Sequence, residues 1–332
     1  MMISRTPFRI SFFGGGTDYP AWYRAHGGSV LATSIDKYCW IFCRYLPPFF
    51  EHRLRIVYSN IELCQTFAEV QHPAVRETLR FLNLQHGVEI HHNGDLPARS
   101  GMGSSSSFTV GLLHALYALQ GAAPNFRQLA EESIHIEQEM ILETVGSQDQ
   151  FCVAFGGLNR IDFHTDGTVD LLPLILSEER KAELNRHLML FYTGIRRTAS
   201  DVAGSYVDSL NRKQELLGQM QAMVERGISI LTDGEDIGRF GQLLHEAWMA
   251  KRELSRVVSN ADIDGLYQSA RAHGAVGGKL VGAGGGGFLL LFVPPEDQGR
   301  VKDHLRHLIH VPFSFENEGS RIIFQEPELA SA

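Results

Sequence analysis

The sequence predicts an α+β protein with two lobes. Segments typical of strands fill the first third of the chain, segments with helical spacing follow, and strand-like segments return near the end. The character of the sequence changes around residues 175–190, where a fresh apolar strand begins. We therefore expect an N-terminal domain at residues 1–183 and a C-terminal domain at residues 184–332.

The N-terminal domain is expected to open with short strands that turn residues separate. Their β-branched and aromatic residues place them at 8–13, 38–45, 54–59 and 88–92. A helix then opens in the serine run after Gly103, and Gly121 and Pro124 stop it. A second helix is expected at about 126–142, and a β-hairpin with a Gly-Gly interruption at 151–163.

The C-terminal domain is expected to begin with a strand and two or three helices. A glycine-rich stretch then feeds an apolar strand, and a helix and a closing strand finish the chain. The spacing places these elements at 188–192, 198–254, 274–288, 288–293, 298–309 and 321–324.

The charge of the chain argues against two classes of partner. Lys and Arg total 30 against 38 Asp and Glu, which gives a formal net charge of -8. Such an acidic chain is a poor candidate for nucleic acid or an anionic membrane surface. An anionic small molecule stays open as a ligand, because local basic groups can bind it.

The apolar runs and the cysteines indicate the cellular compartment of the protein. The longest apolar run, 288–293, is too short to cross a bilayer, and we see no signal peptide at the N-terminus. The four cysteines form no C-x-x-C pair. We therefore expect free thiols in a reducing cytoplasm, with no membrane partner.

The segment LPARSGMGSSSS, residues 96–107, is the most informative stretch. Gly101 and Gly103 allow a tight turn and a close approach to a ligand. The serines open a helix, whose first N–H groups and dipole suit a phosphate group. A plain serine N-cap is the alternative, but one serine suffices for that, so four in a row favour phosphate.

Two other glycine-rich segments carry weaker signals. The segment 282–287 matches G-x-G-x-x-G without the context of a dinucleotide site, so close backbone packing and ligand approach are equal explanations. No Walker loop is present, since Leu280 follows Lys279. In RISFFGGGTDY, Asp18 follows a triple-glycine turn, where capping alone explains it, and Arg9 is equally explained as a surface strand residue.

In this order the three segments resemble the motifs of the GHMP kinase superfamily. They stand here as RISFFGGGTDYP, PARSGMGSSSS and KLVGAGGGG, and ETVGSQDQFCVAFGG is similar to a fourth landmark of the family. The resemblance spans nearly the whole chain. It implies a ribosomal-S5-like N-terminal domain, a ferredoxin-like α+β C-terminal domain, and an active site in the cleft between them.

The resemblance also implies roles for individual residues in phosphoryl transfer from ATP to a hydroxyl group. Asp149 and Arg9 take the catalytic positions, and Ser105 and Glu137 take those of the Mg²⁺ ligands. The ATP site is expected to comprise Pro97, Arg99, Ser100, Gly101, Met102, Gly103, Ser104, Ser105, Ser106 and Ser107. The substrate site is expected to comprise Gly16, Thr17, Asp18, Tyr19, Arg196, Arg197, Gly284 and Gly285.

The N-terminal segment and the serine loop are most similar in sequence to those of bacterial D-glycero-D-manno-heptose 7-phosphate kinases. This implies phosphorylation of the anomeric hydroxyl to the 1,7-bisphosphate, for nucleotide-activated heptose in capsule or lipopolysaccharide synthesis. Galactokinases carry Glu and His where Gly15 and Gly16 stand here, which disfavours galactose. Arg196 and Arg197 suit a substrate phosphate, and a solvated helix start explains them equally well.

Several alternatives stay open. From the residues alone, Asp149 is explained as a turn carboxylate and Glu137 as part of a solvated acidic face, with Glu139 as a substitute metal ligand. Rival functions are a GHMP kinase for fucose, another hexose or an alcohol, and a non-catalytic regulator that binds sugar and ATP. A homodimer also stays open as a partner.

Overall fold

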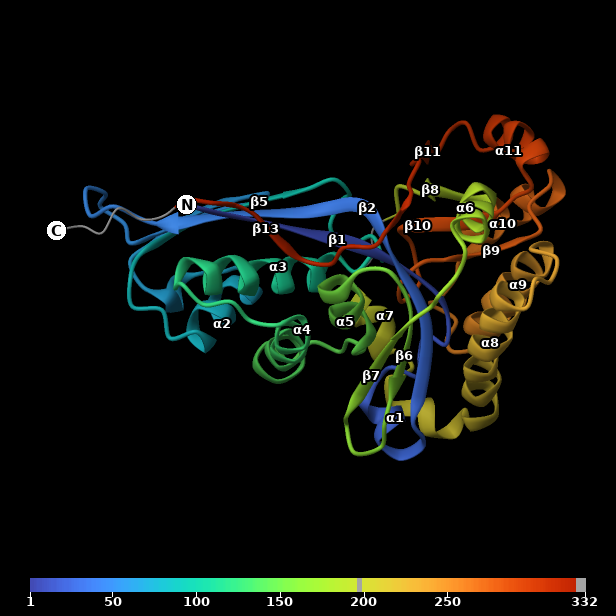
Figure 1. Ribbon diagram of the computed structural model, residues 1–332, viewed down its shortest axis with the longest axis horizontal. Coiled ribbons are helices and arrows are strands. Elements are labelled where there is room, and N and C mark those ends of the chain that lie inside the picture. The colour runs from blue at the N-terminus through green and yellow to red at the C-terminus, as the bar shows by residue number, and fades with distance from the viewer. Residues whose placement is uncertain (196–198, 327–332) are drawn as a thin grey trace.

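The computed structural model describes residues 1–195 and 199–326, and it contains two β-sheets flanked by helices (Figure 1). The larger, nine-stranded sheet has the order β13-β1-β2-β5-β3-β4, and β6, β7 and β12 join it along β2 and β6. Its strands are β1 (Met2–Phe13), β2 (Gly28–Tyr45), β3 (Leu54–Val57), β4 (Ile61–Cys64), β5 (Val88–Gly94), β6 (Leu158–Phe163), β7 (Val169–Pro173), β12 (Phe315–Glu316) and β13 (Arg321–Gln325).

The long strand β2 organises this sheet. Its first part pairs with β6, its second part pairs with β5, and β1 pairs antiparallel with most of its length. The register between β1 and β2 shifts at Pro7 and Phe8, where the proline has no N–H to donate to the ladder. The shift lies just before Arg9 and so helps to set where that side chain points.

One face of the sheet is covered by helices, which lie below it in Figure 1. They are α2 (Pro73–Phe81), α3 (Ser104–Leu119), α4 (Phe126–His135, continued by a π-helical turn at Ile136–Met140) and α5 (Gln148–Phe155). The helix α3 is apolar around most of its circumference, as a helix buried in a core requires. Gly111 allows it to approach the sheet, since a Cβ there would lie 2.8 Å from the Thr6 hydroxyl.

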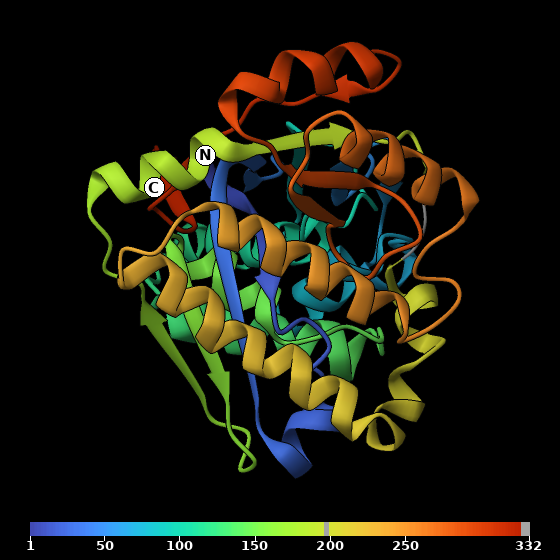
Figure 2. The ribbon, with the colours of Figure 1, turned by 90° about the vertical axis from the view of Figure 1, so that its right-hand side faces the viewer.

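The second sheet has four strands in the order β11-β8-β10-β9. They are β8 (Leu188–Tyr192), β9 (Gly277–Leu280), β10 (Phe288–Phe292) and β11 (Ile309–His310). Figure 2 shows α8 (Gln214–Thr232) and α9 (Gly238–Arg252) side by side; α9 packs on β9 and β10, whereas α8 contacts β1 and β2 of the larger sheet. The remaining helices are α1 (Pro20–His26), α6 (Glu178–His187), α7 (Ala199–Gly204), α10 (Ala261–Ala272), α11 (Gln298–His304) and the short 3₁₀ turns Phe67–Glu69, Val207–Arg212 and Pro295–Asp297.

The α+β class predicted from the sequence is confirmed, and one expected element is wrong. Residues 151–163 do not form a hairpin, because the first half of that segment belongs to the helix α5 and only the second half forms the strand β6. A short apolar run such as FCVAF is compatible with a buried helix or a buried strand. Gly156, with φ +74°, ends the helix where a residue with a Cβ would be strained.

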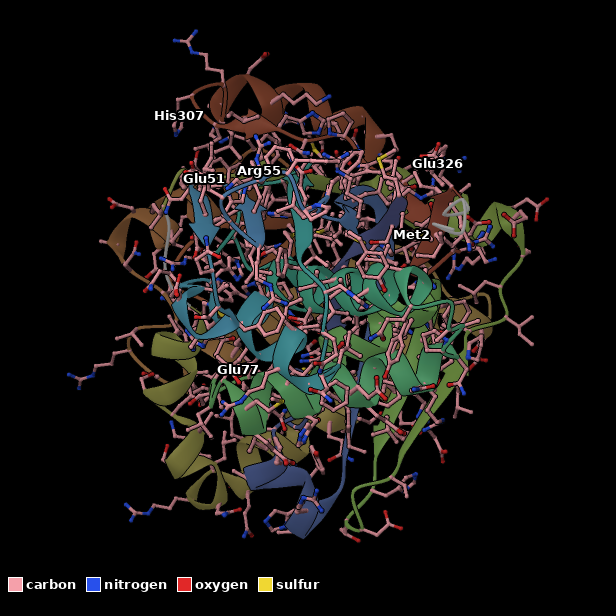
Figure 3. The ribbon with its side chains drawn as sticks, turned by 90° about the vertical axis from the view of Figure 1, so that its left-hand side faces the viewer. Met2, Glu51, Arg55, Glu77, His307 and Glu326 are labelled. Atoms are coloured by element: carbon pink, nitrogen blue, oxygen red, sulfur yellow. The ribbon has the colours of Figure 1, made fainter. Side chains whose placement is uncertain are left out.

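The end of the described chain returns to the first sheet. The closing strand β13 pairs with β1, and β12 pairs with β2. Figure 3 shows Met2 and Glu326 close together at this end of the molecule, where the Glu326 N–H donates to the Met1 carbonyl at 2.9 Å. The edge strand beside β1, which carries Arg9, therefore comes from residues more than 300 positions further along the chain.

Two sequence expectations concern membranes and thiols. Among the described residues, no helix combines the length and the apolar character needed to span a bilayer. Cys39, Cys43, Cys64 and Cys152 are all buried and carry free thiols.

Candidate active site

Arg9 on β1 and Asp149 in the first turn of α5 form a bidentate ion pair. The Arg9 Nε donates to Oδ1 of Asp149 at 2.6 Å, and Nη2 donates to Oδ2 at 2.5 Å. The Arg9 side chain is 5% exposed and that of Asp149 is 22% exposed. Burial alone would lower the pKa of Arg9, but the charge of Asp149 outweighs it and the pKa is raised, so Arg9 stays a cation.

The same guanidinium connects this pair to the loop before α3. The Nη1 of Arg9 donates to the Gly101 carbonyl at 2.5 Å, and the Arg9 backbone N–H donates to the Met102 carbonyl at 3.1 Å. The fold therefore places three segments that lie far apart in the sequence around one small volume, which opens toward solvent at Asp149.

Asp18 lies in the glycine turn that follows β1 and approaches the same region. Its Oδ1 accepts the Gly16 N–H at 2.9 Å, and its Oδ2 accepts the Gln148 amide at 2.8 Å. The next residue along α5 is Asp149, so Gln148 ties the two carboxylates together. Burial raises the pKa of Asp18, and the charge of Asp149 raises it further.

The glycine-serine loop ends at the first turn of α3. Gly103 is the N-cap with φ +75°, and no side chain caps the first N–H groups of this 16-residue helix. The Ser107 hydroxyl donates to the Pro7 carbonyl at 2.8 Å, and the Ser106 hydroxyl to Oε2 of Glu137 at 3.0 Å. Within the described chain, the hydroxyls of Ser104 and Ser105 have no hydrogen-bond partner, so they and the helix N–H groups are available to a ligand.

Glu137 is fully buried in the π-helical turn after α4, and it does not belong to a solvated acidic face. Its carboxylate accepts hydrogen bonds from Ser106, from the Thr109 hydroxyl at 2.8 Å and from the Gln150 amide at 2.5 Å. None of the ion pairs between described residues includes Glu137. Burial raises its pKa to about 7, and the hydrogen bonds oppose that rise.

These contacts fit a divalent cation bound through hard oxygen ligands. A buried carboxylate with neutral partners only is stabilised by a nearby cation, and hydroxyl and carboxylate oxygens are ligands that Mg²⁺ prefers. The described residues contain no group of three or more His, Cys, Asp and Glu side chains, so most of the ligands of such an ion would be phosphates and water. Glu139 is a poorer candidate, since its side chain is 72% exposed and pairs with His135.

The raised pKa of Glu137 predicts a pH dependence of stability. The folded protein holds this proton more tightly than the unfolded chain, whose pKa is near 4.5. This contribution is fully present below pH 4.5 and is lost as the pH rises through 7. We expect the ligand-free protein to lose about 3 kcal/mol more than the Glu137→Gln variant between pH 4.5 and pH 8, measured by denaturant unfolding. Parallel curves for the two proteins would contradict this.

The late glycine segment crosses over the serine loop. A Cβ on Gly282, which has φ +79°, would lie 2.4 Å from the Gly101 Cα, and one on Gly287 would lie 2.1 Å from the Ser100 carbonyl oxygen. Gly284 and Gly285 are buried against Val258, whose carbonyl accepts the Gly285 N–H at 2.8 Å. Close backbone packing therefore explains most of these glycines.

We expect Gly282→Ala to push this segment off the serine loop. The variant should unfold at a lower temperature and should lose kinase turnover, because Gly101 is displaced together with its bond to Arg9. Gly265→Ala is a matched control in the interior of α10, where a Cβ would contact nothing within 4 Å. That change should stabilise the protein by about 0.5–1 kcal/mol in thermal unfolding, with turnover unchanged. Equal effects of both substitutions would refute the proposed contact.

The other sequence-predicted residues occupy varied positions. Thr17 donates its hydroxyl to the carbonyls of Gly14 and Ser29, and Tyr19 packs edge-on against Tyr206, so both support the glycine turn from within. In the serine loop, Met102 is buried, Arg99 is exposed, Pro97 is half-buried, and the Ser100 hydroxyl donates to the Pro97 carbonyl at 2.6 Å. The expected substrate residues Arg196 and Arg197 lie outside the described residues.

Two buried lysines near the site were missed by the sequence analysis. Lys279 donates to the carbonyls of Ser11 and Phe12, each at 2.9 Å, at the end of β1. Lys251 on α9 donates to the Gly282 carbonyl. A signal was present for Lys251, since it follows Leu244 and Trp248 at helical spacing and so lies on the apolar face of its helix.

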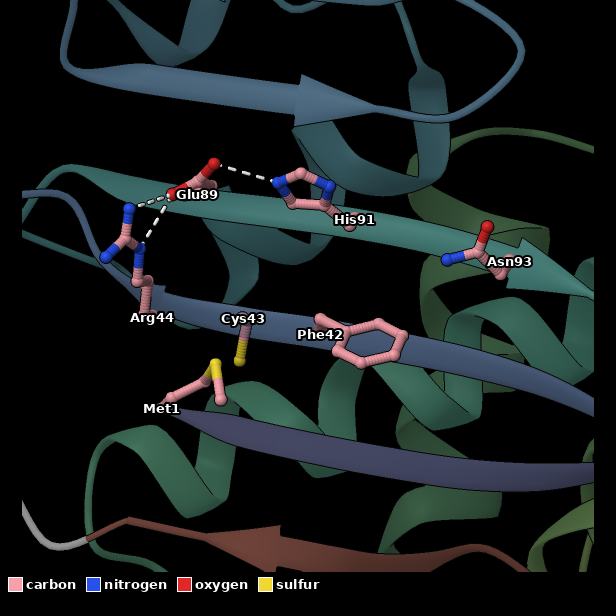
Figure 4. Close-up of a pocket in the computed structure, with 7 residues that line it drawn as sticks. All are labelled: Met1, Phe42, Cys43, Arg44, Glu89, His91 and Asn93. Carbon is pink, nitrogen blue, oxygen red and sulfur yellow. Dashed lines mark hydrogen bonds and ion pairs between the residues drawn. The ribbon is translucent and has the colours of Figure 1, made fainter.

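A separate pocket of about 300 Å³ lies on the face of the large sheet turned away from α3 (Figure 4). Its lining comprises Met1, Phe42, Cys43, Arg44, Glu89, His91 and Asn93. Glu89 accepts hydrogen bonds from Arg44 at 2.7 Å and from His91 at 2.8 Å. Its charged groups pair with one another, and it shares no residue with the Arg9–Asp149 site.

Comparison with known proteins assigns the fold to a family. The family model described as GHMP kinases N terminal domain matches residues 67–157, and the model described as GHMP kinases C terminal matches residues 220–310. Together they span more than half of the chain. The chain belongs to the GHMP kinase family.

This GHMP kinase is similar to sugar kinases along its whole length. It is 27% identical to D-glycero-alpha-D-manno-heptose 7-phosphate kinase of Campylobacter jejuni, over 95% of this chain and 97% of that protein. It is 25% identical to galactokinase of Thermococcus kodakarensis, over 87% and 88% of the two chains. A crystal structure of a D-glycero-D-manno-heptose 1-phosphate kinase from Bacteroides thetaiotaomicron has the same fold, with a TM-score of 0.80 at 22% identity over 98% of this chain and 100% of that one. The chain is thus an ATP-dependent sugar kinase that acts on a hydroxyl group.

Proposed function

We propose that this GHMP kinase phosphorylates the anomeric hydroxyl of D-glycero-D-manno-heptose 7-phosphate. The product is the 1,7-bisphosphate, a precursor of nucleotide-activated heptose. Similarity to the heptose 7-phosphate kinase of Campylobacter jejuni supports the substrate. The observation that supports the reaction is the Arg9–Asp149 pair, joined through one guanidinium to the Gly101 carbonyl. It sets a carboxylate that can accept a proton beside a loop that can hold phosphates.

In this proposal the serine loop binds the triphosphate of ATP. The uncapped N–H groups of α3 and the free hydroxyls of Ser104 and Ser105 donate to phosphate oxygens. Glu137, with a hydroxyl from Ser105 or Ser106, would hold Mg²⁺, which would neutralise charge on the phosphates. The hydrogen bond from the Ser106 hydroxyl to Glu137 favours Ser106 as the second metal ligand. The family pattern instead assigns this role to Ser105.

Asp149 then accepts the proton of the sugar hydroxyl as that oxygen attacks the γ-phosphorus. Arg9 orients the carboxylate from one side and keeps it anionic. Asp18 holds other sugar hydroxyls, because its carboxylate lies in the same small volume and is fixed by Gly16 and Gln148. Arg196 and Arg197 are proposed to bind the 7-phosphate.

We propose that residues 1–183 supply the serine loop and the catalytic pair, and that residues 184–332 supply the late glycine segment and substrate contacts. ATP and Mg²⁺ are the proposed cofactors, and the reducing cytoplasm is the proposed location, where the four buried thiols stay free. No nucleic acid is expected as a partner, since the net charge is -8.

A panel of acceptors tests the substrate. Purified enzyme with ATP and Mg²⁺ is offered D-glycero-D-manno-heptose 7-phosphate, free heptose, fucose, galactose and mevalonate, and ADP release is measured. We expect the highest kcat/KM for heptose 7-phosphate and a new anomeric phosphate in the phosphorus NMR spectrum of the product. A higher kcat/KM for fucose or galactose would reassign the substrate. If no acceptor on the panel causes ADP release, the protein is better explained as a regulator that binds sugar and ATP.

A further inference from the structure

Lys251 is a buried cation without a carboxylate partner. Its side chain enters the core from α9, and the residue is 6% exposed. The Nζ donates to the Gly282 carbonyl, and none of the ion pairs in residues 1–195 and 199–326 includes it. An ammonium group in such a place is costly unless an anion compensates it.

The neighbouring charged groups are already engaged. Arg9 is occupied by Asp149 and Gly101, and Lys279 by two backbone carbonyls. An ammonium group has three N–H donors, and Lys251 uses one of them on Gly282. Lys251 therefore keeps two N–H donors for a ligand, against one on Lys279.

The position of Lys251 connects the two halves of the reaction. Gly282 packs directly on Gly101, and the Gly101 carbonyl accepts the Arg9 guanidinium. The charges of Asp18 and Asp149 favour the protonated form of Lys251, whereas the charge of Arg9 disfavours it. Lys251 is therefore connected to the Arg9–Asp149 pair through Gly282 and Gly101.

We propose that the Lys251 ammonium binds the phosphoryl group in transfer between ATP and the sugar hydroxyl. This inference rests on the proposed function. In that step the acceptor oxygen forms a bond to the γ-phosphorus, the bond from the γ-phosphorus to the β–γ bridging oxygen breaks, the acceptor proton goes to Asp149, and ADP leaves. The two free N–H groups of Lys251 stabilise the negative charge on the equatorial oxygens during the exchange.

The charge state of Lys251 suits this task. Burial, together with the charge of Arg9, lowers its pKa to about 8, while Asp18 and Asp149 oppose that shift. Burial lowers the pKa of the neighbouring Lys279 well below its usual value, and the charge of Lys251 lowers it further. The ammonium is therefore mostly protonated at neutral pH, and an arriving phosphoryl group raises its pKa again.

Two variants test the inference. Lys251→Met removes the charge and every donor, whereas Lys251→Gln keeps an N–H for the Gly282 carbonyl and so preserves the packing. The matched control is Lys213→Met, because the Lys213 Nζ donates to the carbonyls of Glu253 and Leu254 at 2.6 and 2.7 Å in a purely structural contact. Each protein is assayed for kcat and for the KM of ATP and of the sugar.

A binding measurement complements the kinetics. Thermal unfolding is recorded with Mg²⁺ and ADP, and again after adding aluminium fluoride and the acceptor sugar, since aluminium fluoride mimics a phosphoryl group in transfer. We expect both Lys251 variants to lose about 100-fold or more in kcat with KM values nearly unchanged. They should keep the shift caused by ADP and lose the added shift caused by aluminium fluoride. Lys213→Met should lower the unfolding temperature and keep kcat and both shifts.

Three outcomes would overturn the inference. If Lys251→Gln keeps kcat and the aluminium fluoride shift, Lys251 only supports Gly282. If its KM for the sugar phosphate rises at constant kcat, Lys251 binds the phosphate of the substrate instead. If Lys213→Met loses kcat equally, the effect comes from weakened packing. Wild-type turnover on the acceptor panel tests the proposed function separately, and the variants are compared on the acceptor that the wild type phosphorylates best.

Discussion

Replacing Asp149 with asparagine is expected to lower kcat by about 10³-fold, within the range that general acid–base groups contribute. The amide cannot accept the proton of the sugar hydroxyl, and it leaves the Arg9 guanidinium without its anion. The KM for ATP should change little, because the serine loop keeps its own donors. Steady-state turnover of the purified variant, measured well below its unfolding temperature, checks this.

The control for this substitution is a partly buried arginine–aspartate pair outside the candidate site. Arg160 Nε donates to both carboxylate oxygens of Asp162 on β6, at 2.8 and 2.7 Å. Asp162→Asn should cost some stability and leave turnover within about twofold, since this partly buried pair shares no residue with the candidate site. Near-normal turnover of Asp149→Asn, or an equal loss in Asp162→Asn, would remove Asp149 from the mechanism.

The second large effect concerns Glu137. Changing Glu137 to glutamine keeps an oxygen for the Ser106 and Thr109 hydroxyls and removes the negative charge. We expect the Mg²⁺ concentration for half-maximal turnover to rise by about 10- to 100-fold, as loss of a group that tunes a metal site typically causes. Titration of Mg²⁺ at fixed ATP measures this.

Glu139→Gln is the control, because Glu139 lies only two positions after Glu137. Its side chain is exposed and pairs with His135. Its Mg²⁺ dependence should match that of the wild type. If Glu139→Gln raises the Mg²⁺ requirement and Glu137→Gln does not, the assignment is displaced along the helix.

Local patterns predicted most of the elements, and they did so where spacing is unambiguous. The apolar strand β8 lies at Leu188–Tyr192 as expected, and α3 opens in the serine run. The α5 segment failed because five apolar residues carry no period that separates helix from strand. The pairing of β13 with β1 joins residues at opposite ends of the chain, and local sequence contains no signal for such contacts.

The candidate site shows the same division. Arg9, Asp18, Asp149 and Glu137 were identified through family spacing, and the structure brings the first three together around Gly101 and Gln148. Spacing could not show which serine faces Glu137, because one residue along a helix turns the side chain by about 100°. It also could not show that Lys251 meets Gly282, since that contact depends on how α9 packs on the second sheet.

A crystal structure with Mg²⁺, a non-hydrolysable ATP analogue and the sugar phosphate tests the central claim most directly. We predict that the triphosphate lies at the N-terminus of α3, that the acceptor oxygen lies about 3–3.5 Å from the γ-phosphorus, and that this oxygen contacts the Asp149 carboxylate. A triphosphate that binds away from residues 101–107, or a γ-phosphorus that is remote from Asp149, would contradict the account.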